Sequence, residues 1–285
     1  MLDSKNREMG KQEAGMIYGM YLSTMGALVQ SHRHATIANN LANANTQGFK
    51  PDWSIFAEVP VENEFHPDRF FQWDKILMNT GGGVWNDASV TNLAPGPMRE
   101  SGNPFDLALH DEPGSGQHSF FRLRPDNAGA DEIYYSRDGH FIPDQDGVLR
   151  NVVGDLVLSP DGVPVNVTPP VPGSAITVRG DGVIVANNPA NGGNDILGQI
   201  GVFRTADHRD MVKTGDSRFI SDGARMENWQ NGVMSGYLEE SATNAIEEMT
   251  NMIEASRIYE TNMRFLSIQD EQLGNAVSRI ASRVS

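Results

Sequence analysis

The amino-acid sequence predicts an α+β fold, in which long, coiled-coil-forming N- and C-terminal helices flank a central all-β domain. Two observations predict this class. Apolar residues recur at alternating steps of three and four near both ends of the chain, and the middle consists of short apolar stretches separated by turn dipeptides. The predicted segments are an N-terminal extension, an N-terminal helix, a connector, a β-rich domain and a C-terminal helix region, over residues 1–15, 16–50, 51–97, 98–225 and 226–285.

The N-terminal helix is predicted over about residues 17–45. Its apolar residues follow heptad spacing and, after a polar interval, resume it, at Tyr18, Leu22, Met25, Val29, Ile37, Leu41 and Ala44. Gly48 is suited to the left-handed conformation that follows a helix, and Pro51 blocks a restart. The pattern therefore predicts that the helix stops before Gly48.

The C-terminal helix is predicted over about residues 238–280, and its pattern is longer. Steps of three and four alternate without a break through Ala242, Ala245, Met249, Met252, Ser256, Tyr259, Met263, Leu266, Asp270, Leu273, Val277 and Ile280. Such spacing over more than three heptads is typical of a coiled-coil seam. The carboxylate pairs Glu239–Glu240 and Glu247–Glu248 are interpreted as part of a solvated face away from that seam.

The β-rich middle is predicted from its turns. The dipeptide Asp-Gly, a strong hairpin signal between apolar runs, occurs at residues 138–139, 146–147, 161–162, 181–182 and 222–223. Residues 134–135 and 141–142 are predicted to pair across the first of these turns. Residues 156–158 and 163–165 are predicted to pair across the third.

Composition excludes several classes of function. The 285 residues hold 22 Lys and Arg against 37 Asp and Glu, a formal net charge of −15, so no nucleic-acid partner is expected. Cysteine is absent, which excludes disulfides, thiolate metal sites and Cys nucleophiles. No run approaches the roughly 20 apolar residues of a membrane-spanning helix, so no membrane insertion is expected. The polar start of the chain does not resemble a cleaved secretory signal.

The residue patterns predict no catalytic, cofactor or metal site. The seven histidines are scattered without a metal-binding spacing, and no local sequence marks a pair of catalytic carboxylates. The chain is therefore expected not to be an enzyme.

Residues 38–50, which read ANNLANANTQGFK, are the most unusual segment. Four asparagines within seven positions are costly in a helix, because Asn is a poor helix former. Asn amides in a helix–helix contact would fix the register of the helices. The alternative is that they act as local caps in a frayed last turn.

At these residues the chain resembles the bacterial flagellar rod and hook protein family. The segment ANNLANANTQGFK is similar to the N-terminal signature of that family, and SGNPFDLAL (residues 101–109) to its entrance to the β domain. The similarity continues in Phe120–Phe121 and YSRDGHF (residues 135–141). GYLEES (residues 236–241), EEM, MIEA and RIYE (residues 247–249, 252–255 and 257–260) are similar to the C-terminal signature. The family usually begins near Met16, so residues 1–15 are expected to be an extension, or Met16 to be the true start.

The resemblance implies a structural subunit of the flagellar basal-body rod that polymerises through its terminal helices into the torque-transmitting axial tube. It implies export through the flagellar type III apparatus without a cleaved signal peptide, and a location in the periplasm-spanning rod. The implied partners are further copies of the chain, other axial proteins of rod and hook, and the export apparatus. The assembly residues expected in the N-terminal segment are Leu22, Met25, Val29, Ile37, Asn39, Asn40, Leu41, Asn43, Gly48 and Phe49. Those in the C-terminal segment are Leu238, Glu239, Met249, Met252, Ile253, Tyr259, Met263, Leu266 and Leu273.

Two alternatives remain open at this point. One is a peptidoglycan-acting enzyme associated with the rod, which would need two converging carboxylates in a pocket. The other is a secreted binding protein with a β head on a coiled-coil stalk, which would form no filament.

Overall fold

The computed structural model describes residues 2–59, 83–112, 116–126, 129, 132–168, 174–188, 193–205, 211–221, 226–229 and 231–284. The chain divides into two compact units, and each is described by itself. The first unit contains both ends of the chain and residues 52–90, and the second contains residues 42–51 and 91–244.

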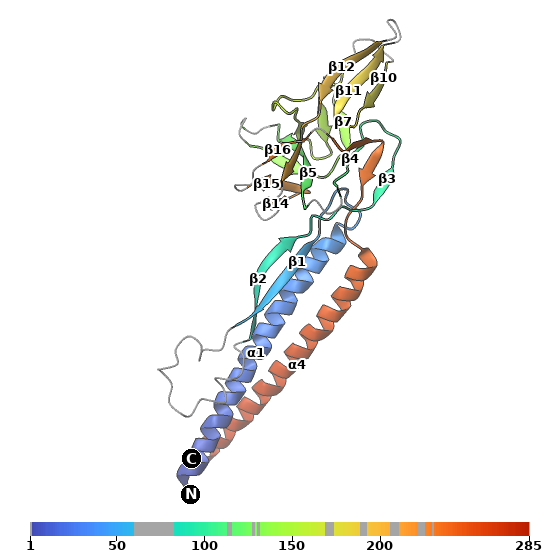
Figure 1. Ribbon diagram of the computed structural model, residues 1–285. Coiled ribbons are helices and arrows are strands. Elements are labelled where there is room, and N and C mark those ends of the chain that lie inside the picture. Colours follow the sequence, from blue (N-terminus) through green and yellow to red (C-terminus); the bar gives the residue numbers. More distant parts are fainter. Residues whose placement is uncertain are drawn as a thin grey trace. The chain divides into compact units, whose positions relative to one another are not determined.

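The first unit consists of two helices and a strand pair (Figure 1). Its elements are α1 (Leu2–Ala42), β1 (Asp52–Glu58), β2 (Val84–Thr91) and α4 (Ala245–Val284). Strands β1 and β2 lie on α1, where the hydroxyls of Ser54 and Thr36 are 2.9 Å apart. The opposite side of β1 leaves Trp53 and Ile55 exposed, as the alternation of a half-covered strand requires. Among the described residues, no helix combines the length and apolar character that crossing a bilayer requires.

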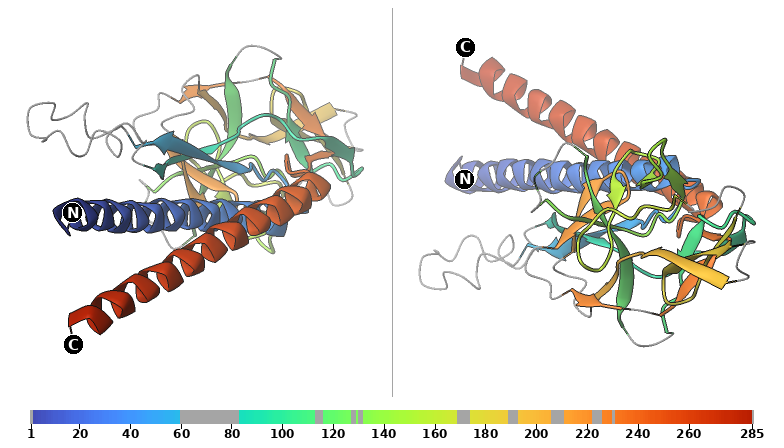
Figure 2. Two further views of the ribbon diagram at one scale, coloured as in Figure 1. Left: turned by 90° about the horizontal axis from the view of Figure 1, so that it is seen from below. Right: turned by 90° about the horizontal axis from the view of Figure 1, so that it is seen from above.

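The predicted fold class, with coiled-coil-forming terminal helices, is wrong. The described residues contain one helix at each end of the chain around a large central β region, and α1 and α4 form no apolar coiled-coil seam. Met249, Met263 and Val277, which the heptad pattern placed in the seam, are exposed. Polar residues one position earlier in the heptad, Asn262 among them, contact α1 instead. Both views of Figure 2 show α4 as a straight rod inclined to α1.

The helix boundaries also differ from the prediction. Helix α4 begins at Ala245, so Leu238 and Glu239 lie in a strand, β18 (Tyr237–Glu239), rather than in the first turns of the helix. Backbone pairing explains this, because β18 pairs with β3 (Met98–Glu100), with Leu238 opposite Arg99. The spacing of apolar residues along the sequence does not indicate such long-range strand pairing.

The second unit is a β structure. Its further strands are β4 (Leu107–Leu109), β5 (His118–Arg124), β6 (Tyr134–Ser136), β7 (Phe141–Pro143), β8 (Leu149–Asn151), β9 (Leu156–Val157), β10 (Ala175–Val178), β11 (Val183–Asn188), β12 (Gly193–Gln199), β13 (Val202–Thr205), β14 (Met211–Gly215), β15 (Arg218–Ser221), β16 (Glu227–Asn228) and β17 (Val233–Ser235). The largest sheet has the order β14-β15-β6-β5-β9-β8-β7, with β13 joining β5 and β16. Strands β10, β11 and β12 form a second sheet, and β17 pairs with β4.

The core of this unit gathers side chains from distant strands. Phe121 of β5 packs edge-on against Phe141 of β7, with ring centroids 5.1 Å apart, and Ile184 of β11 belongs to the same buried cluster. A second cluster centres on Phe120 and Phe219, whose ring centroids are 5.6 Å apart. Neighbouring residues of β5 thus point into two different clusters, as the alternation of a strand requires.

The structure contains some of the turns predicted at the Asp-Gly dipeptides and contradicts one of the predicted strand pairings. Residues 146–147 turn between β7 and β8, residues 161–162 close the short pairing of Leu158 with Pro164, and residues 181–182 join β10 to β11. The predicted pairing of residues 134–135 with 141–142 is wrong, because β6 pairs with β5 and β15 whereas β7 pairs with β8. Residues 222–223 lie outside the described residues.

Candidate functional site

The segment after α1 and the segment before α4 meet within the second unit. The backbone N–H of Gly48 donates to the carbonyl of Glu239 at 2.8 Å, and the N–H of Ala242 donates to the carbonyl of Phe49 at 3.1 Å. These bonds align residues 48–50 with residues 239–242. The two sequence signatures of the chain ends therefore form one local structure.

Gly48 is required at this junction for two reasons. Its φ of 63° lies in the left-handed region, where a side chain is strained. A Cβ at this position would also lie 2.5 Å from the backbone carbon of Arg137 and from the backbone nitrogen of Asp138. Because both neighbours are main-chain atoms of the connection between β6 and β7, neither can move aside without a shift of the backbone.

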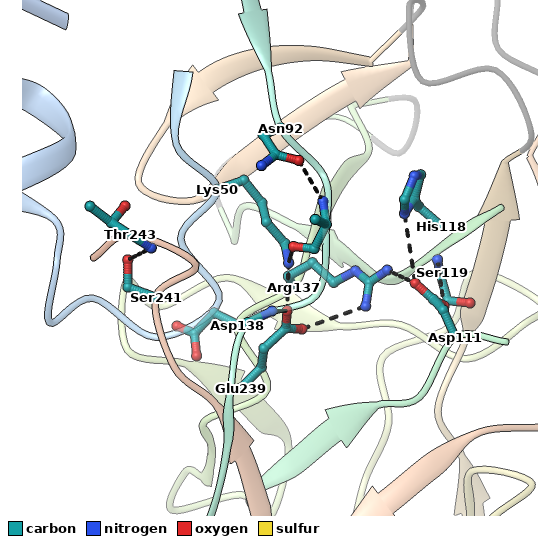
Figure 3. A network of polar contacts seen from close by, with 12 residues as sticks. Lys50, Asn92, Asp111, His118, Ser119, Arg137, Asp138, Glu239, Ser241 and Thr243 are labelled. Carbon is teal, nitrogen blue, oxygen red and sulfur yellow. Dashed lines mark hydrogen bonds and ion pairs between the residues drawn. The ribbon is translucent and has the colours of Figure 1, made fainter. Parts of the chain in front are cut away.

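An ion pair between Lys50 and Glu239 lies at the centre of the junction (Figure 3). Both side chains are fully buried, and Lys50 Nζ lies 2.5 Å from Glu239 Oε1. Lys50 Nζ also donates to the carbonyl of Ala94 at 2.7 Å, and Glu239 Oε1 also accepts from the N–H of Gly96 at 2.8 Å. A buried ion pair needs such additional hydrogen bonds to offset the loss of hydration.

Arg137 connects this pair to a second carboxylate. Its buried guanidinium forms an ion pair with Asp111, and its Nη1 lies 3.5 Å from Glu239 Oε2. It also lies over the ring of Phe120, 5.3 Å from the ring centroid. We call Lys50, Arg137, Asp111 and Glu239 the junction network. It holds two cations and two anions, so its formal charges balance.

The surroundings shift the pKa of two members. Burial lowers the pKa of the Lys50 ammonium, and the adjacent Glu239 carboxylate opposes this shift. Burial alone would raise the pKa of Asp111. The imidazole of His118 and the guanidinium of Arg137 outweigh it, and they hold the pKa of Asp111 well below its usual value of 3.8. Asp111 is therefore ionised at neutral pH and balances the charge of Arg137.

The chemistry of the junction network is structural. Its charged groups face one another and backbone donors and acceptors, an arrangement that fixes a fold rather than one that presents a reacting group. Within the described ranges, no group of three or more His, Asp and Glu residues could hold a metal ion.

The structure separates the predicted N-terminal assembly residues into two places. Gly48 and Phe49 are buried in the junction of the second unit, whereas the others lie on α1 or just after it. On α1, Val29, Ile37 and Asn40 are buried, Leu22, Met25 and Leu41 are half-buried, and Asn39 is exposed. Asn43, which follows the helix, is half-buried and accepts a hydrogen bond from the hydroxyl of Thr46.

Asn40 connects three elements of the first unit. Its amide Nδ2 donates to the carbonyl of Asp52 at 2.9 Å and to Glu248 Oε1 at 3.1 Å. Its Oδ1 accepts from the N–H of Asp52 at 3.0 Å. One side chain thereby links α1 to the first residue of β1 and to the first turn of α4.

The predicted C-terminal assembly residues also fall into separate groups. Leu238 and Glu239 are buried in β18, whereas Met252, Leu266 and Leu273 are half-buried on α4. The other four lie exposed on α4, namely Met249, Ile253, Tyr259 and Met263. The junction thus brings together Gly48, Phe49, Leu238 and Glu239, and the helical residues lie in the other unit.

Lys50, Arg137 and Asp111 did not appear among the predicted site residues. The interpretation of Glu239 as part of a solvated helix face was also wrong, since the side chain is fully buried. A signal was available, because Lys50 and Arg137 each lie within a segment already singled out as a family signature. Asp111 carries no comparable signal, since its partner is 26 residues away in the sequence.

Comparison with known proteins gives matches at both ends and along most of the chain. The family described as "Flagella basal body rod protein" matches residues 21–50, and "Flagellar basal body rod FlgEFG protein C-terminal" matches residues 234–279. The chain is 30% identical to flagellar basal-body rod protein FlgF of Caulobacter vibrioides over 250 residues, which cover 86% of this chain and 90% of the relative.

Other relatives are similar over nearly their whole length. Flagellar basal-body rod protein FlgG of Buchnera aphidicola is 27% identical over 270 residues, 90% of this chain and 98% of the relative. FlgF of Escherichia coli is 29% identical over 266 residues, 89% and 95% of the two chains. Both matched family segments contain residues of the junction network, Lys50 in the first and Glu239 in the second.

Proposed function

Because the chain belongs to the flagellar basal-body rod protein family, which is structural and not enzymatic, we propose that it polymerises through its terminal helices into the axial tube of the rod. In this proposal the tube transmits torque across the periplasm. The neighbours of the chain are further copies of itself and other axial proteins of rod and hook. The chain reaches this place through the flagellar export apparatus, without a cleaved signal peptide.

The observation that carries the proposal is the exposure of apolar side chains on α4. One group lies along one side of the helix at steps of three and four, namely Ile246, Met249 and Ile253. A second group lies along another side, namely Ile258, Phe265 and Ile268. A helix that is apolar on several sides belongs in an interior with several partners.

Burial of these side chains would supply the energy of assembly. Full burial of one Ile, Phe or Met side chain contributes about 1.5–3 kcal/mol. The two exposed groups point in different directions, so they cannot both be satisfied by one partner across a two-fold axis. Heterologous contacts that do not close on themselves build open helical filaments.

The test introduces the same negative charge at one position inside the second exposed group and at one exposed position outside it. In the source bacterium, the chromosomal copy is replaced by Phe265→Asp or by the matched control Ser267→Asp, two residues away on another side of the helix. Phe265 is 53% exposed, and Ser267 is exposed as well, so neither change disturbs the interior of the subunit. We expect Phe265→Asp to abolish motility and to be missing from isolated basal bodies, because it buries an unpaired charge.

Ser267→Asp is expected to be incorporated. The exported fraction in the culture medium separates loss of assembly from loss of export, since Phe265→Asp should still be secreted. Equal incorporation of both variants into basal bodies would contradict the proposal.

The enzyme alternative is excluded, because the family is structural. The alternative of a secreted binding protein with a β head on a coiled-coil stalk is not supported, because the helices form no coiled-coil stalk within the described residues.

A further inference from the structure

Helices α1 and α4 contact each other at positions that are seven and fourteen residues apart. Gly19 faces Gln269, Gly26 faces Asn262, and Asn40 faces Glu248. From one contact to the next, the residue number rises along α1 and falls by the same amount along α4. The helices therefore run in opposite directions with one constant register.

The two glycines of α1 make room for amide side chains of α4. A Cβ at Gly26 would lie 3.0 Å from Nδ2 of Asn262, and a Cβ at Gly19 would lie 2.5 Å from Nε2 of Gln269. Glycine inside a helix costs about 0.5–1 kcal/mol relative to alanine. Helix stability therefore does not explain two glycines one heptad apart, and the structure shows that they leave room for the amide ends of Asn262 and Gln269.

Ala255 continues the same row of α4. It lies seven residues after Glu248 and seven before Asn262, and it is 0% exposed. A small, buried side chain thus stands between the polar residues of this row. The row formed by Glu248, Ala255, Asn262 and Gln269 is therefore made of small and polar side chains, while the exposed apolar residues of α4 lie on its other sides.

Polar contacts of this kind select one register. Asn40 donates to Glu248, and a shift of α4 by one heptad would remove that hydrogen bond. Gln269 Oε1 is buried and accepts no hydrogen bond from the described part of the chain. The amide end of Gln269 occupies the space that a side chain at residue 19 would take. A buried polar contact lowers stability but penalises every wrong register more, as a single Asn does in paired helices.

We propose that these six residues, three on each helix, set the register and the rotation of α4 against α1. We call them the amide ladder: Gly19, Gly26, Asn40, Glu248, Asn262 and Gln269. The ladder keeps the polar row of α4 against α1 and so leaves the two exposed apolar groups of α4 available to other copies of the chain. This last consequence rests on the proposed function, whereas the register itself is a property of the single subunit.

Disulfide mapping tests the register directly, because the chain contains no cysteine. Two in-register pairs are made, Gly26→Cys with Asn262→Cys and Gly19→Cys with Gln269→Cys. Two out-of-register pairs use the same four substitutions, Gly26→Cys with Gln269→Cys and Gly19→Cys with Asn262→Cys. Every substitution thus occurs once in each class, so local effects on the helices cancel in the comparison.

The in-register pairs should form an intramolecular disulfide at least about tenfold faster than the out-of-register pairs in dilute, purified chain. A shift of seven residues moves a partner by about 10 Å, and disulfides need Cα atoms within about 7 Å. The products are read as monomers of altered mobility on non-reducing gels. Equal rates for the two classes, or absence of the in-register disulfides, would overturn the ladder.

A second variant tests the role of the glycine space. Gly26→Leu, added to the Gly19→Cys and Gln269→Cys pair, should slow that disulfide about tenfold, because it drives the helices apart one heptad away. An unchanged rate would contradict the ladder. Both experiments use the free subunit, so their failure leaves the incorporation of Phe265→Asp and Ser267→Asp into basal bodies as a separate question.

Discussion

Lys50 and Glu239 are 189 residues apart in the sequence and form a fully buried ion pair with an N–O distance of 2.5 Å. Lys50 ends the signature that follows α1, and Glu239 lies in the signature that precedes α4. The pair therefore joins the two chain segments that enter and leave the second unit.

Removal of the Glu239 carboxylate should destabilise the second unit strongly. Glu239→Ala leaves Lys50 and Arg137 buried without their shared partner, which costs about 3–5 kcal/mol. The neighbouring Glu240→Ala is the matched control. Glu240 pairs with Arg99 at the surface, where both side chains are about half exposed, so its loss should cost at most about 1 kcal/mol. Urea unfolding followed by tryptophan fluorescence measures both, and similar losses would show that the buried pair has no special role.

Substitution of Gly48 should cost more than backbone strain alone. Gly48→Ala adds a Cβ 2.5 Å from main-chain atoms of Arg137 and Asp138, in addition to the strain of a positive φ. Gly102 has a similar φ of 74°, but nothing lies within 4 Å of its added Cβ. We expect Gly102→Ala to lower the free energy of unfolding by about 1–2 kcal/mol, and Gly48→Ala by clearly more. Equal effects would mean that the close approach to Arg137 is unimportant.

The junction network should lose stability in acid through Asp111. The folded state holds the pKa of this carboxyl well below 3.8, its ordinary value, because of His118 and Arg137. A depressed pKa contributes stability that is present above about pH 3.8 and is lost as the pH falls further. Asp111→Asn should therefore be less stable than the parent chain at pH 7, and the difference should shrink below pH 3.8. Urea unfolding at pH 7, 5 and 3 checks this, and a difference that does not change with pH would contradict it.

Asn40 should contribute far more to the first unit than its neighbours in the Asn-rich segment. Asn40→Ala removes two donated hydrogen bonds and one accepted hydrogen bond. The backbone N–H and carbonyl of Asp52 and the carboxylate of Glu248 then lose their partner. At about 1 kcal/mol for each bond, we expect a loss of roughly 2–3 kcal/mol. Asn45→Ala, at an exposed position, should change stability by less than about 0.5 kcal/mol. The measurement is hydrogen exchange of the Asp52 amide, which should accelerate only in Asn40→Ala.

Local chemistry in the sequence was a good guide where the structure depends on local contacts. The turns at residues 146–147, 161–162 and 181–182 follow from Asp-Gly itself, since glycine takes the positive φ that each turn needs. The same dipeptide at residues 138–139 misled the pairing of β6. There glycine is needed at position 139 because a Cβ would collide with the carbonyl of Leu107. No local sequence pattern predicts that contact.

The predictions that failed concern features that depend on contacts between residues far apart in the sequence. The heptad pattern of α4 predicted Met249 and Met263 in a seam, because apolar spacing reports where apolar residues are and not what faces them. The ladder residues Glu248, Asn262 and Gln269 of α4 are polar, and their partners on α1 are two glycines and an asparagine. In the same way, the burial of Glu239 depends on Lys50 and Arg137, which come from distant segments.

The most direct test of the account compares the two exposed methionines of α4 in the free and the assembled subunit. Met249 is 52% exposed and Met263 is 41% exposed in the single chain. Hydroxyl-radical footprinting with mass spectrometry would measure their oxidation rates in purified monomer and in isolated basal bodies. We expect rapid oxidation of both in the monomer and at least about tenfold protection in the basal body, because neighbouring subunits cover them. Oxidation in the basal body as fast as in the monomer would contradict it.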